Sequence, residues 1–242
     1  MAEQTVNKKY SISAFFPVYN DWGTISSMVF LVSSVLEKAC SEYEIILVDD
    51  GSKELTKSVL GELKNKFEKL RIITHEKNKG YGGALKSGFY NAKYELIFYT
   101  DGDAQYNPQE LTLLLDKFND DIDIVNGYKI SRSDPVYRKI IGRLYHYITR
   151  IMFGFKIRDV DCDFRLIRRK IFDDLALEYD SGVICVEMIS RMSKRGYMFS
   201  EVPVHHYYRV SGKSEFFNFK RIYRVARNLI KLWYIIQFRK LY

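Results

Sequence analysis

Residues 95–108, which read ELIFYTDGDAQYNP, decide the fold of this chain. Residues 95–100 gather aliphatic, aromatic and β-branched side chains, as short buried strands do. The apolar run stops at Asp101-Gly102-Asp103, and Asn107 followed by Pro108 has the composition of a helix start. A strand that ends in acids and leads into a helix is typical of one step of an α/β fold.

The same step recurs along the first half of the chain. Four further strands are expected, at residues 11–16, 44–49, 70–75 and 123–127. Helices are expected between them, at residues 24–39, 55–68, 83–92 and 108–118. Repeated alternation implies right-handed crossovers and a mostly parallel central sheet that is flanked by helices on both faces.

The pattern changes after Tyr128. A helix is expected at residues 137–153, an irregular acidic stretch at 159–163, a second helix at 183–194 and a strand at 198–202. No linker rich in proline, glycine and serine separates the two halves. We therefore expect one catalytic domain over residues 1–214 and a helical tail over residues 215–242.

Composition narrows the class of protein. Of 242 residues, 47% are hydrophobic and 28% are charged, which excludes a disordered or fibrous chain. Three scattered cysteines, Cys40, Cys162 and Cys185, favour a reduced, cytoplasmic setting over a disulfide framework or a zinc site. The polar start of the sequence argues against a signal peptide. The lack of a run of about 18 apolar residues argues against a membrane-spanning helix.

The net charge of +8 is confined to the C-terminal part of the sequence. Residues 205–242 hold nine of the 38 Lys and Arg residues and one of the 30 Asp and Glu residues, so the rest of the chain is balanced. A nucleic-acid surface on the main body is therefore disfavoured.

Polar residues follow three of the expected strands directly, at residues 17–21, 49–52 and 101–105. Each alone reads as a turn that caps the next helix. Because the carboxyl ends of parallel strands meet at one edge, where such sheets bind ligands, we expect the three groups to form one site.

Asp101, Asp103 and Gln105 alternate along this edge, so their oxygens can face one point. Oxygen ligands suit Mg²⁺ or Mn²⁺, and Mg²⁺ usually takes one or two carboxylates with water and substrate phosphates. An exposed acidic turn is the alternative. The glycine-rich run Gly80-Tyr81-Gly82-Gly83 suits a phosphate but also close helix packing, and it lacks the Walker and Rossmann spacings.

Taken in order, these motifs resemble glycosyltransferase family 2, with the GT-A fold, and within it the dolichyl-phosphate mannosyltransferase and polyprenyl-phosphate glycosyltransferase branch. The resemblance spans about residues 11–215 and rests on this series: Pro17-Val18-Tyr19-Asn20-Asp21, Asp49-Asp50-Gly51-Ser52, Asn78 with Gly80, 101–108, Arg158-Asp159, Phe164-Arg165, Glu187-Met188, Glu201-Val202-Pro203 and Arg209 with Gly212 and Ser214. It implies inverting, metal-dependent transfer of a sugar from a nucleotide-diphosphate sugar to a polyprenyl phosphate.

The resemblance also implies residue roles. The nucleotide-sugar would contact Pro17, Tyr19, Asp21, Asp49, Asp50, Gly80, Asp101 and Gly102. The metal would be held by Asp101, Asp103 and Gln105, with Asp103 also catalytic. The acceptor phosphate would be bound by Lys129, Arg165, Arg209 and Ser214.

Two departures from the branch keep other acceptors open. The chain has Asp161-Cys162-Asp163 where the branch commonly has Thr-Ser-Gly, and Lys129 where it tends to have arginine. A sugar hydroxyl in a surface glycan needs a base, for which Asp161, Asp163 and Glu187 are candidates. A catalytically silent membrane partner with the same fold is a third hypothesis.

The tail has a basic stripe, in which Lys220, Arg224, Arg227 and Lys231 recur at helical spacing. Aromatic and aliphatic residues from 216 to 238 fill the rest of the helix. This pattern predicts an interfacial helix on anionic lipid and hence a peripheral protein at the inner face of the membrane. The alternative is a helix that packs its apolar side on the catalytic domain.

Overall fold

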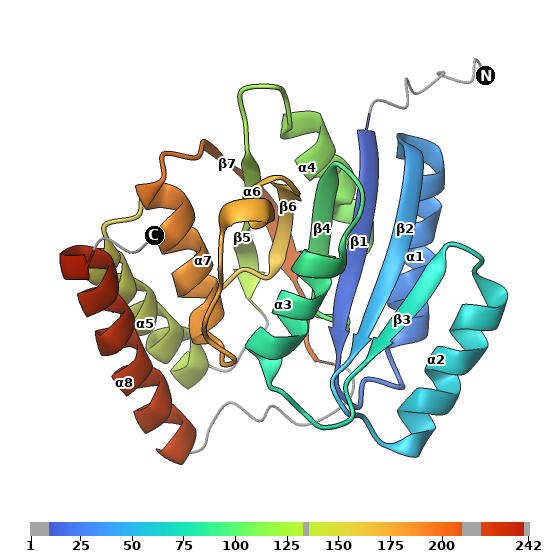
Figure 1. The fold of residues 1–242 in the computed structure, drawn as a ribbon, viewed down its shortest axis with the longest axis horizontal. Helices are drawn as coiled ribbons and strands as arrows, with labels where there is room; N and C mark the ends of the chain where they lie inside the picture. Colours follow the sequence, from blue (N-terminus) through green and yellow to red (C-terminus); the bar gives the residue numbers. More distant parts are fainter. Residues whose placement is uncertain (1–9, 133–135, 210–218, 240–242) are drawn as a thin grey trace.

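The computed structural model describes residues 10–132, 136–209 and 219–239. For residues 131–132, 136–140 and 219–222 it describes the backbone alone. It forms three layers, with one seven-stranded sheet between two sets of helices (Figure 1). The strands are β1 (Tyr10–Val18), β2 (Cys40–Asp49), β3 (Leu70–Thr74), β4 (Leu96–Thr100), β5 (Ile124–Arg132), β6 (Phe164–Arg168) and β7 (Phe199–His206). Their order across the sheet is β3-β2-β1-β4-β6-β5-β7.

The sheet is parallel except for one strand. β6 runs antiparallel to both of its neighbours, β4 and β5, while the pairs β1 with β2, β1 with β4, β2 with β3 and β5 with β7 are parallel. The carboxyl ends of the six parallel strands therefore share an edge with the amino end of β6. A mostly parallel sheet was expected, and the structure confirms it.

The helices are α1 (Ile25–Ala39), α2 (Glu54–Lys66), α3 (Tyr81–Asn91), η1 (Pro108–Glu110), α4 (Leu111–Lys117), α5 (Val136–Phe153), α6 (Ile171–Asp174), α7 (Val183–Lys194), α8 (Phe219–Tyr234) and the π-helical turn η2 (Ile235–Arg239). Asn107 caps η1 by accepting a hydrogen bond from the Gln109 N–H, as its place before Pro108 predicts. Each long helix that the sequence indicates is present.

Two hydrophobic cores lie on opposite faces of the sheet. One packs α1, α2 and α4 on the sheet, and the other packs α3, α6, α7 and α8. Successive strand residues alternate between them, so that Phe16 belongs to the first core and Phe15 to the second. Strands buried on both faces read as continuous apolar runs, which explains why residues 95–100 carry so clear a strand signal.

The sequence missed two elements, β6 and the short α6. β6 is the five-residue run Phe-Arg-Leu-Ile-Arg, which follows the acidic stretch and has no turn signal of its own. β7 is also longer than expected, since it continues to His206. The additional strand matters for function because it carries residues 159–163 to the carboxyl edge.

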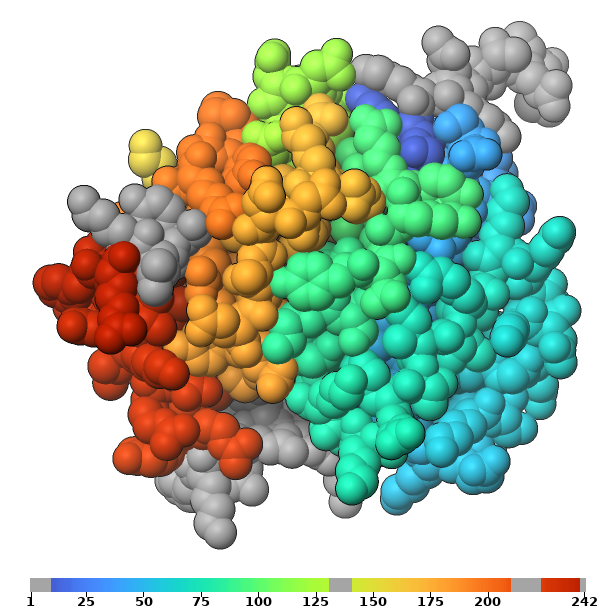
Figure 2. All heavy atoms as spheres, viewed as in Figure 1, coloured from blue at the N-terminus to red at the C-terminus, as the bar shows by residue number. Residues whose placement is uncertain are grey.

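Helix α8 is docked on the catalytic body. Leu229, Leu232 and Ile236 are buried in the second core, where α8 contacts α7. Figure 2 shows α8 in red against the orange α7. The expected boundary between domain and tail, at 214/215, lies outside the described residues and stays a prediction.

In the part of the chain that the structure describes, no helix combines the length and the apolar character needed to cross a bilayer.

Candidate active site

The carboxyl edge of the sheet brings four carboxylates together. We call Asp21, Asp101, Asp103 and Asp163 the acid cluster. Asp21 follows β1, Asp101 and Asp103 follow β4, and Asp163 precedes the reversed strand β6. Thr100 pairs with Phe164 in the sheet, so the next residues outward, Asp101 and Asp163, are neighbours at the edge. The cluster lies beyond the carboxyl ends of the paired strands β1 and β4, where the strand order reverses and such sheets bind ligands.

The proximity of the carboxylates alters their proton affinities. Burial, followed by the charges of Asp163 and Asp103, raises the pKa of Asp101 well above its ordinary value, although a hydrogen bond from the Tyr81 hydroxyl to Asp101 Oδ1 (2.8 Å) opposes the shift. Burial is also the main reason that the pKa of Asp103 rises to about 6. Neighbouring carboxyl groups whose pKa values are raised in this way are stabilised in their ionised form by a cation placed among them.

Arg209 supplies one such positive charge from the chain itself. Its Nη2 lies 3.7 Å from Asp21 Oδ1 and 3.6 Å from Asp103 Oδ2, so one guanidinium connects the β1 and β4 sides of the site. Arg209 and the Tyr19 N–H counteract the burial that raises the pKa of Asp21. Arg209 was expected at an acceptor phosphate, and the structure brings it to the cluster.

The donor set fits a hard divalent cation, because the acid cluster offers only oxygen atoms. No three acidic, cysteine or histidine side chains within the described ranges converge as a ready-made ligand set. Asp101 and Asp103 would therefore hold such an ion, and substrate phosphates and water would complete its coordination shell. The expected third ligand, Gln105, donates its side-chain amide to the Tyr207 carbonyl (3.2 Å).

The backbone between Asp103 and Gln105 is held in an uncommon conformation. Ala104 has φ 60°, in the left-handed region that residues with a Cβ seldom adopt. This turn lets the Gln105 N–H donate to Asp103 Oδ1 (3.1 Å). Strain of this kind, which costs about 1–3 kcal/mol, typically persists at functional sites.

The loops after β1 and β2 are joined beside the cluster. The Asn20 N–H donates to Ser52 Oγ (3.1 Å), and Asn20 Oδ1 accepts from the Lys53 N–H (2.9 Å). Asp49 Oδ1 accepts from the Ser52 N–H (2.9 Å), whereas its buried Oδ2 has no hydrogen-bond partner in the described structure. Since buried polar atoms are nearly always satisfied, Asp49 Oδ2 is a candidate acceptor for a ligand N–H.

Asp50 organises the loop after β3. Its carboxylate accepts from the N–H groups of Lys79 (2.8 Å) and Gly80 (3.0 Å), and Oδ1 lies 2.7 Å from His75 Nδ1. His75 Nε2 in turn lies 2.8 Å from Ser87 Oγ. Asp50, which was expected to contact the nucleotide-sugar, is buried and holds this loop in place. The contacts of His75 with Asp50 and Ser87 are a feature that the sequence analysis did not predict.

The Gly80–Gly82 segment packs directly on the backbone of residues 179–180. A Cβ at Gly80, which has φ 86°, would lie 2.5 Å from the Asp180 carbonyl oxygen, and one at Gly82 would lie 2.3 Å from that of Tyr179. The Gly82 N–H donates to the Asp180 carbonyl (2.9 Å). These glycines serve close packing, the alternative that the sequence left open.

Arg165 requires a correction. It was expected to bind an acceptor phosphate, but its side chain is fully buried in β6 and is bonded to Asn126, Tyr99 and the Val160 carbonyl. It also lies 3.3 Å from Asp163 Oδ1. The Arg165 guanidinium is therefore bonded within the fold and does not line the surface of the site. Arg165 positions Asp163, which also accepts from the Cys185 thiol (3.2 Å).

Glu187 requires a second correction. It was a candidate base, but its fully buried carboxylate accepts from the N–H groups of Glu178 and Tyr179 and pairs with Arg191. These partners anchor α7 to the loop before it. Glu187 therefore has a structural role.

The remaining acceptor-side residues are Lys129, Asp161 and Ser214. Lys129 Nζ donates to the Asp161 carbonyl (2.7 Å) and lies 3.4 Å from Asp159 Oδ2, so its charge is used within the acidic stretch. Burial raises the pKa of Asp161 to about 7. Ser214 lies outside the described residues.

Pro17 and Gly102 meet at the edge, where a Cβ at Gly102 would lie 3.2 Å from the Pro17 carbonyl oxygen.

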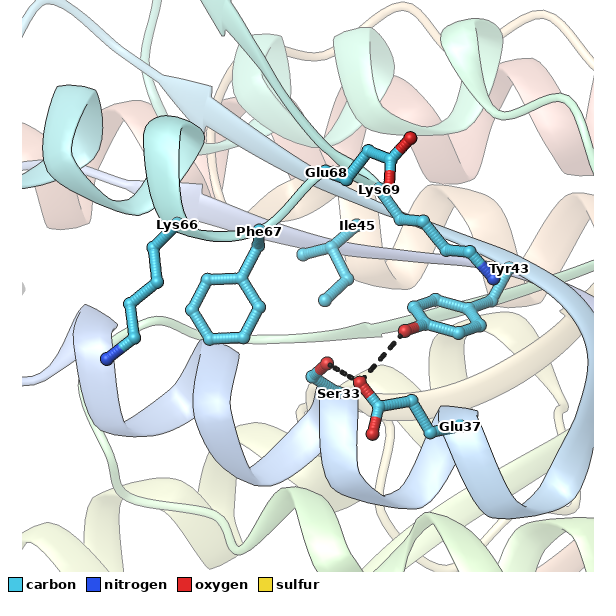
Figure 3. A pocket seen from close by; sticks show the side chains of 8 residues that line it. All are labelled: Ser33, Glu37, Tyr43, Ile45, Lys66, Phe67, Glu68 and Lys69. Atoms are coloured by element: carbon cyan, nitrogen blue, oxygen red, sulfur yellow. Dashed lines mark hydrogen bonds between the residues drawn. The ribbon is translucent and has the colours of Figure 1, made fainter.

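A pocket lies away from this edge, at the amino end of β2. Figure 3 shows its lining residues, among them Glu37, which accepts from Ser33 and Tyr43. Its volume is about 210 Å³. Its position at the opposite end of the strands separates it from the acid cluster.

Comparison with known proteins identifies the family. The model of "Glycosyl transferase family 2" matches residues 13–176, more than half of the chain. The chain belongs to glycosyl transferase family 2. The match covers the acid cluster residues Asp21, Asp101, Asp103 and Asp163, which confirms the family and the glycosyltransferase class expected from the motifs.

Solved structures confirm the fold. Glucosyl-3-phosphoglycerate synthase from Mycobacterium tuberculosis, in complex with Mn²⁺, UDP and glucosyl-3-phosphoglycerate, is similar with a TM-score of 0.70 and 16% identity, over 93% of this chain and 79% of that chain. The same enzyme with Mg²⁺ and UDP gives 0.69 and 15%, over 93% and 78%. The helix α8 at the C-terminal end also agrees with the expected architecture.

Proposed function

We propose that the protein is an inverting, metal-dependent glycosyltransferase that uses a nucleotide-diphosphate sugar. The observation that carries this proposal is the meeting of four carboxylates and Arg209 beyond the carboxyl ends of β1 and β4. The similar mycobacterial enzyme has been crystallised with Mn²⁺ and UDP-glucose, which supports the same donor class here. Family membership adds the reaction class.

Asp101 and Asp103 would hold Mg²⁺ or Mn²⁺ against the donor diphosphate. When bound, the ion neutralises the charge that develops on the leaving diphosphate. The Ala104 turn fixes the Asp103 carboxylate by directing the Gln105 N–H at it. Tyr81 does the same for Asp101 through its hydroxyl.

Asp49 and Tyr19 would bind the nucleoside. Tyr19 is an exposed aromatic residue beside the cluster, and Asp49 Oδ2 is a buried acceptor that has no partner among the described residues. A base with an N–H on its pairing edge, such as uracil or guanine, would satisfy that oxygen. This arrangement favours a uridine or guanosine diphosphate sugar.

The first acceptor candidate is a polyprenyl phosphate at a membrane surface. Two helices present exposed apolar stripes: Ile141, Leu144, Ile148 and Ile151 on α5, and Tyr223, Ile230 and Tyr234 on α8. The helices lie side by side in Figure 1, and Gln237 of η2, which follows α8 directly, donates to the Met152 carbonyl of α5. Apolar stripes beside basic residues suit an anionic bilayer. Arg209 would then contact the acceptor phosphate.

The second acceptor candidate is a sugar hydroxyl. Asp163 lies next to Asp101, and Asp161 has a pKa of about 7, which suits a general base at neutral pH. The burial of Arg165 and the ion pair of Lys129 with Asp159 remove two of the cations expected for a phosphate acceptor, which favours this candidate.

A transfer assay separates these possibilities. The protein is incubated with labelled nucleotide sugars, Mn²⁺ and either polyprenyl phosphate or a glycan acceptor, and products are separated by solvent extraction. Label in the lipid phase supports the first candidate, and label in the glycan supports the second. Lack of donor hydrolysis and transfer with every sugar would contradict an active transferase and support a silent partner.

The variant Asp163→Asn distinguishes the two acceptor candidates further, because a general base is required only for a hydroxyl acceptor. With a hydroxyl acceptor, we expect kcat to fall by about 10²-fold or more. An ionised phosphate acceptor needs only positioning, so kcat should stay within about tenfold. Asp161→Asn is the matched variant, because the two acids flank Cys162.

A further inference from the structure

A second pocket lies between α8 and the catalytic body. Its volume is about 530 Å³, and its walls come from three segments: residues 78–80, residues 178–181 and one side of α8. The α8 residues are Arg224, Asn228 and Lys231, which recur at helical spacing and so share one side of the helix. Figure 2 shows α8, in red, along the margin of the body. None of the pocket residues belongs to the acid cluster.

The pocket carries uncompensated positive charge. Lys79, Arg224 and Lys231 line it, and no ion pair joins any of them to a carboxylate within the described residues. The two acids in its wall are paired with cations elsewhere: Asp180 with Lys86 (2.6 Å) and Glu178 with Arg191 (2.8 Å). The charges of the three lining cations therefore remain available to an anion.

Buried hydroxyls provide an independent indication. Tyr179 is 8% exposed, and neither its hydroxyl nor the buried Ser181 Oγ has a hydrogen-bond partner among the residues that the structure describes. Both residues line the pocket. Asn78 uses its Oδ1 for the Gly80 N–H (3.0 Å), which leaves its amide N–H groups as donors. Because buried polar atoms are nearly always hydrogen-bonded, these two hydroxyls are candidate contacts for a bound molecule.

These groups share one chemical character, since ammonium, guanidinium, amide N–H and hydroxyl groups all donate hydrogen bonds. A phosphate group offers several acceptor oxygens and up to two negative charges, and guanidinium matches it in bidentate fashion. We propose that this pocket is a second anion site, which binds a phosphate group between α8 and the loop of residues 78–80.

The site would join two parts of the protein. The loop of residues 78–80 is held by Asp50 beside the proposed nucleotide site, whereas α8 carries one of the exposed apolar stripes. A phosphate contacted by Lys79 and Arg224 would fasten α8 to that loop. The phosphate group belongs either to a free anion or to a lipid headgroup, and the test separates these sources.

The test measures binding in EDTA, which keeps divalent ions from the acid cluster. One arm titrates inorganic phosphate by calorimetry. The other measures sedimentation with phosphatidylcholine vesicles that contain phosphatidic acid. Arg224→Gln and Arg227→Gln form a matched pair, because both remove one exposed charge from α8 and only Arg224 lines the pocket. Tyr179→Phe removes one buried hydroxyl without a partner, and we expect it to leave the melting temperature unchanged.

We expect saturable binding that Arg224→Gln and Tyr179→Phe weaken about tenfold or more, and that Arg227→Gln changes less than about threefold. This pattern in both arms identifies a free anion site, and in the vesicle arm alone it identifies a headgroup site. Asp103→Asn should bind normally, so the result is independent of the proposed transferase activity. Equal losses in Arg224→Gln and Arg227→Gln, or no saturable binding in either arm, would overturn the proposal.

Discussion

Burial of the Asp103 carboxylate destabilises the folded protein when this group is ionised, and a bound cation would offset that cost. Its pKa rises to about 6 in the folded chain, against an ordinary value of 3.8. The folded state therefore binds the proton more tightly than the unfolded state does. The free energy of unfolding without metal should fall as the pH rises from about 4 to 7, because ionising the buried group is then increasingly costly in the folded state.

Asp103→Asn tests this account. The variant should be more stable than the wild type at pH 7.5 and should differ little at pH 4.5, since the wild-type carboxyl is then largely protonated. Urea unfolding in EDTA at both pH values measures the difference. Mn²⁺ should stabilise the wild type at pH 7.5 and not the variant. An equal stability gain at both pH values would show that the charge of Asp103 is not responsible.

Asp49→Asn tests the nucleoside side of the site. The substitution keeps an oxygen for the Ser52 N–H and places an amide where the unpartnered Oδ2 lies. We expect nucleotide affinity to fall about tenfold or more, because an acceptor for the base N–H is lost. Calorimetry with UDP and GDP in Mn²⁺ measures it. Undiminished affinity for the preferred nucleotide would remove Asp49 from the base pocket.

The residues also show where sequence reasoning reaches its limit. The acids after β1 and β4 could be placed at one edge, because parallel strands end together. Arg165 and Glu187 could not be assigned, because nothing in a sequence distinguishes a buried, fully bonded arginine or glutamate from one at a ligand. Their roles depend on Asn126, Tyr99 and Arg191, which lie 39, 66 and 4 residues away.

Among the elements, the contact between α3 and the 179–180 backbone should be intolerant of a side chain. A Cβ at Gly82 would lie 2.3 Å from a backbone oxygen, so Gly82→Ala must displace one of the two segments. We expect a loss of about 1–3 kcal/mol in the free energy of unfolding. Donor affinity should also fall, because the neighbouring loop of residues 79–80 is bonded to Asp50.

Gly61→Ala is the control, because a Cβ there meets nothing within 4 Å and Gly61 lies inside helix α2. It should raise the free energy of unfolding by about 0.4–1 kcal/mol. Chemical denaturation of both variants measures the contrast. If Gly82→Ala were as stable as Gly61→Ala, the close approach of the two segments would be wrong.

Helix α8 has one apolar side packed on the body and another exposed. Leu232 is fully buried, so Leu232→Ala should cost about 2–5 kcal/mol of unfolding free energy. Ile230 is 61% exposed, so Ile230→Ala should change stability by less than about 0.5 kcal/mol. If the exposed stripe meets lipid, Ile230→Ala should instead lower binding to anionic vesicles, by about three- to tenfold.

Vesicle sedimentation and thermal unfolding of both variants therefore separate packing from membrane contact. Unchanged vesicle binding of Ile230→Ala would contradict the membrane role of this stripe. The sequence indicated an amphipathic helix but left open which side packs, because its apolar residues occupy most of the helical circumference. Packing on the second core, including the contact with α7, divides them into a buried and an exposed set.

For β6, the sequence offered too little signal. Its five residues follow an acidic stretch, and its antiparallel direction depends on the strands on either side of it, β4 and β5. The parallel strands could be predicted because each is part of a strand-helix repeat. The reversed strand breaks that repeat, and it brings Asp163 beside Asp101.

At the scale of the whole molecule, the sheet edge, the acid cluster and α8 form one arrangement. The edge collects carboxylates from β1, β4 and β6, and Arg209, after β7, lies across the β1 and β4 acids. α8 packs beside α7 with apolar and basic residues exposed. This arrangement suits the proposed function, in which the donor binds at the edge and the acceptor is delivered from a surface.

The most direct test is calorimetric titration of UDP and GDP into the wild type and Asp103→Asn, each with Mn²⁺ and with EDTA. The account predicts saturable binding of one nucleotide to the wild type that requires Mn²⁺ and weakens about tenfold or more in the variant. Binding that is unaffected by EDTA and by Asp103→Asn, or no binding of either nucleotide, would contradict it.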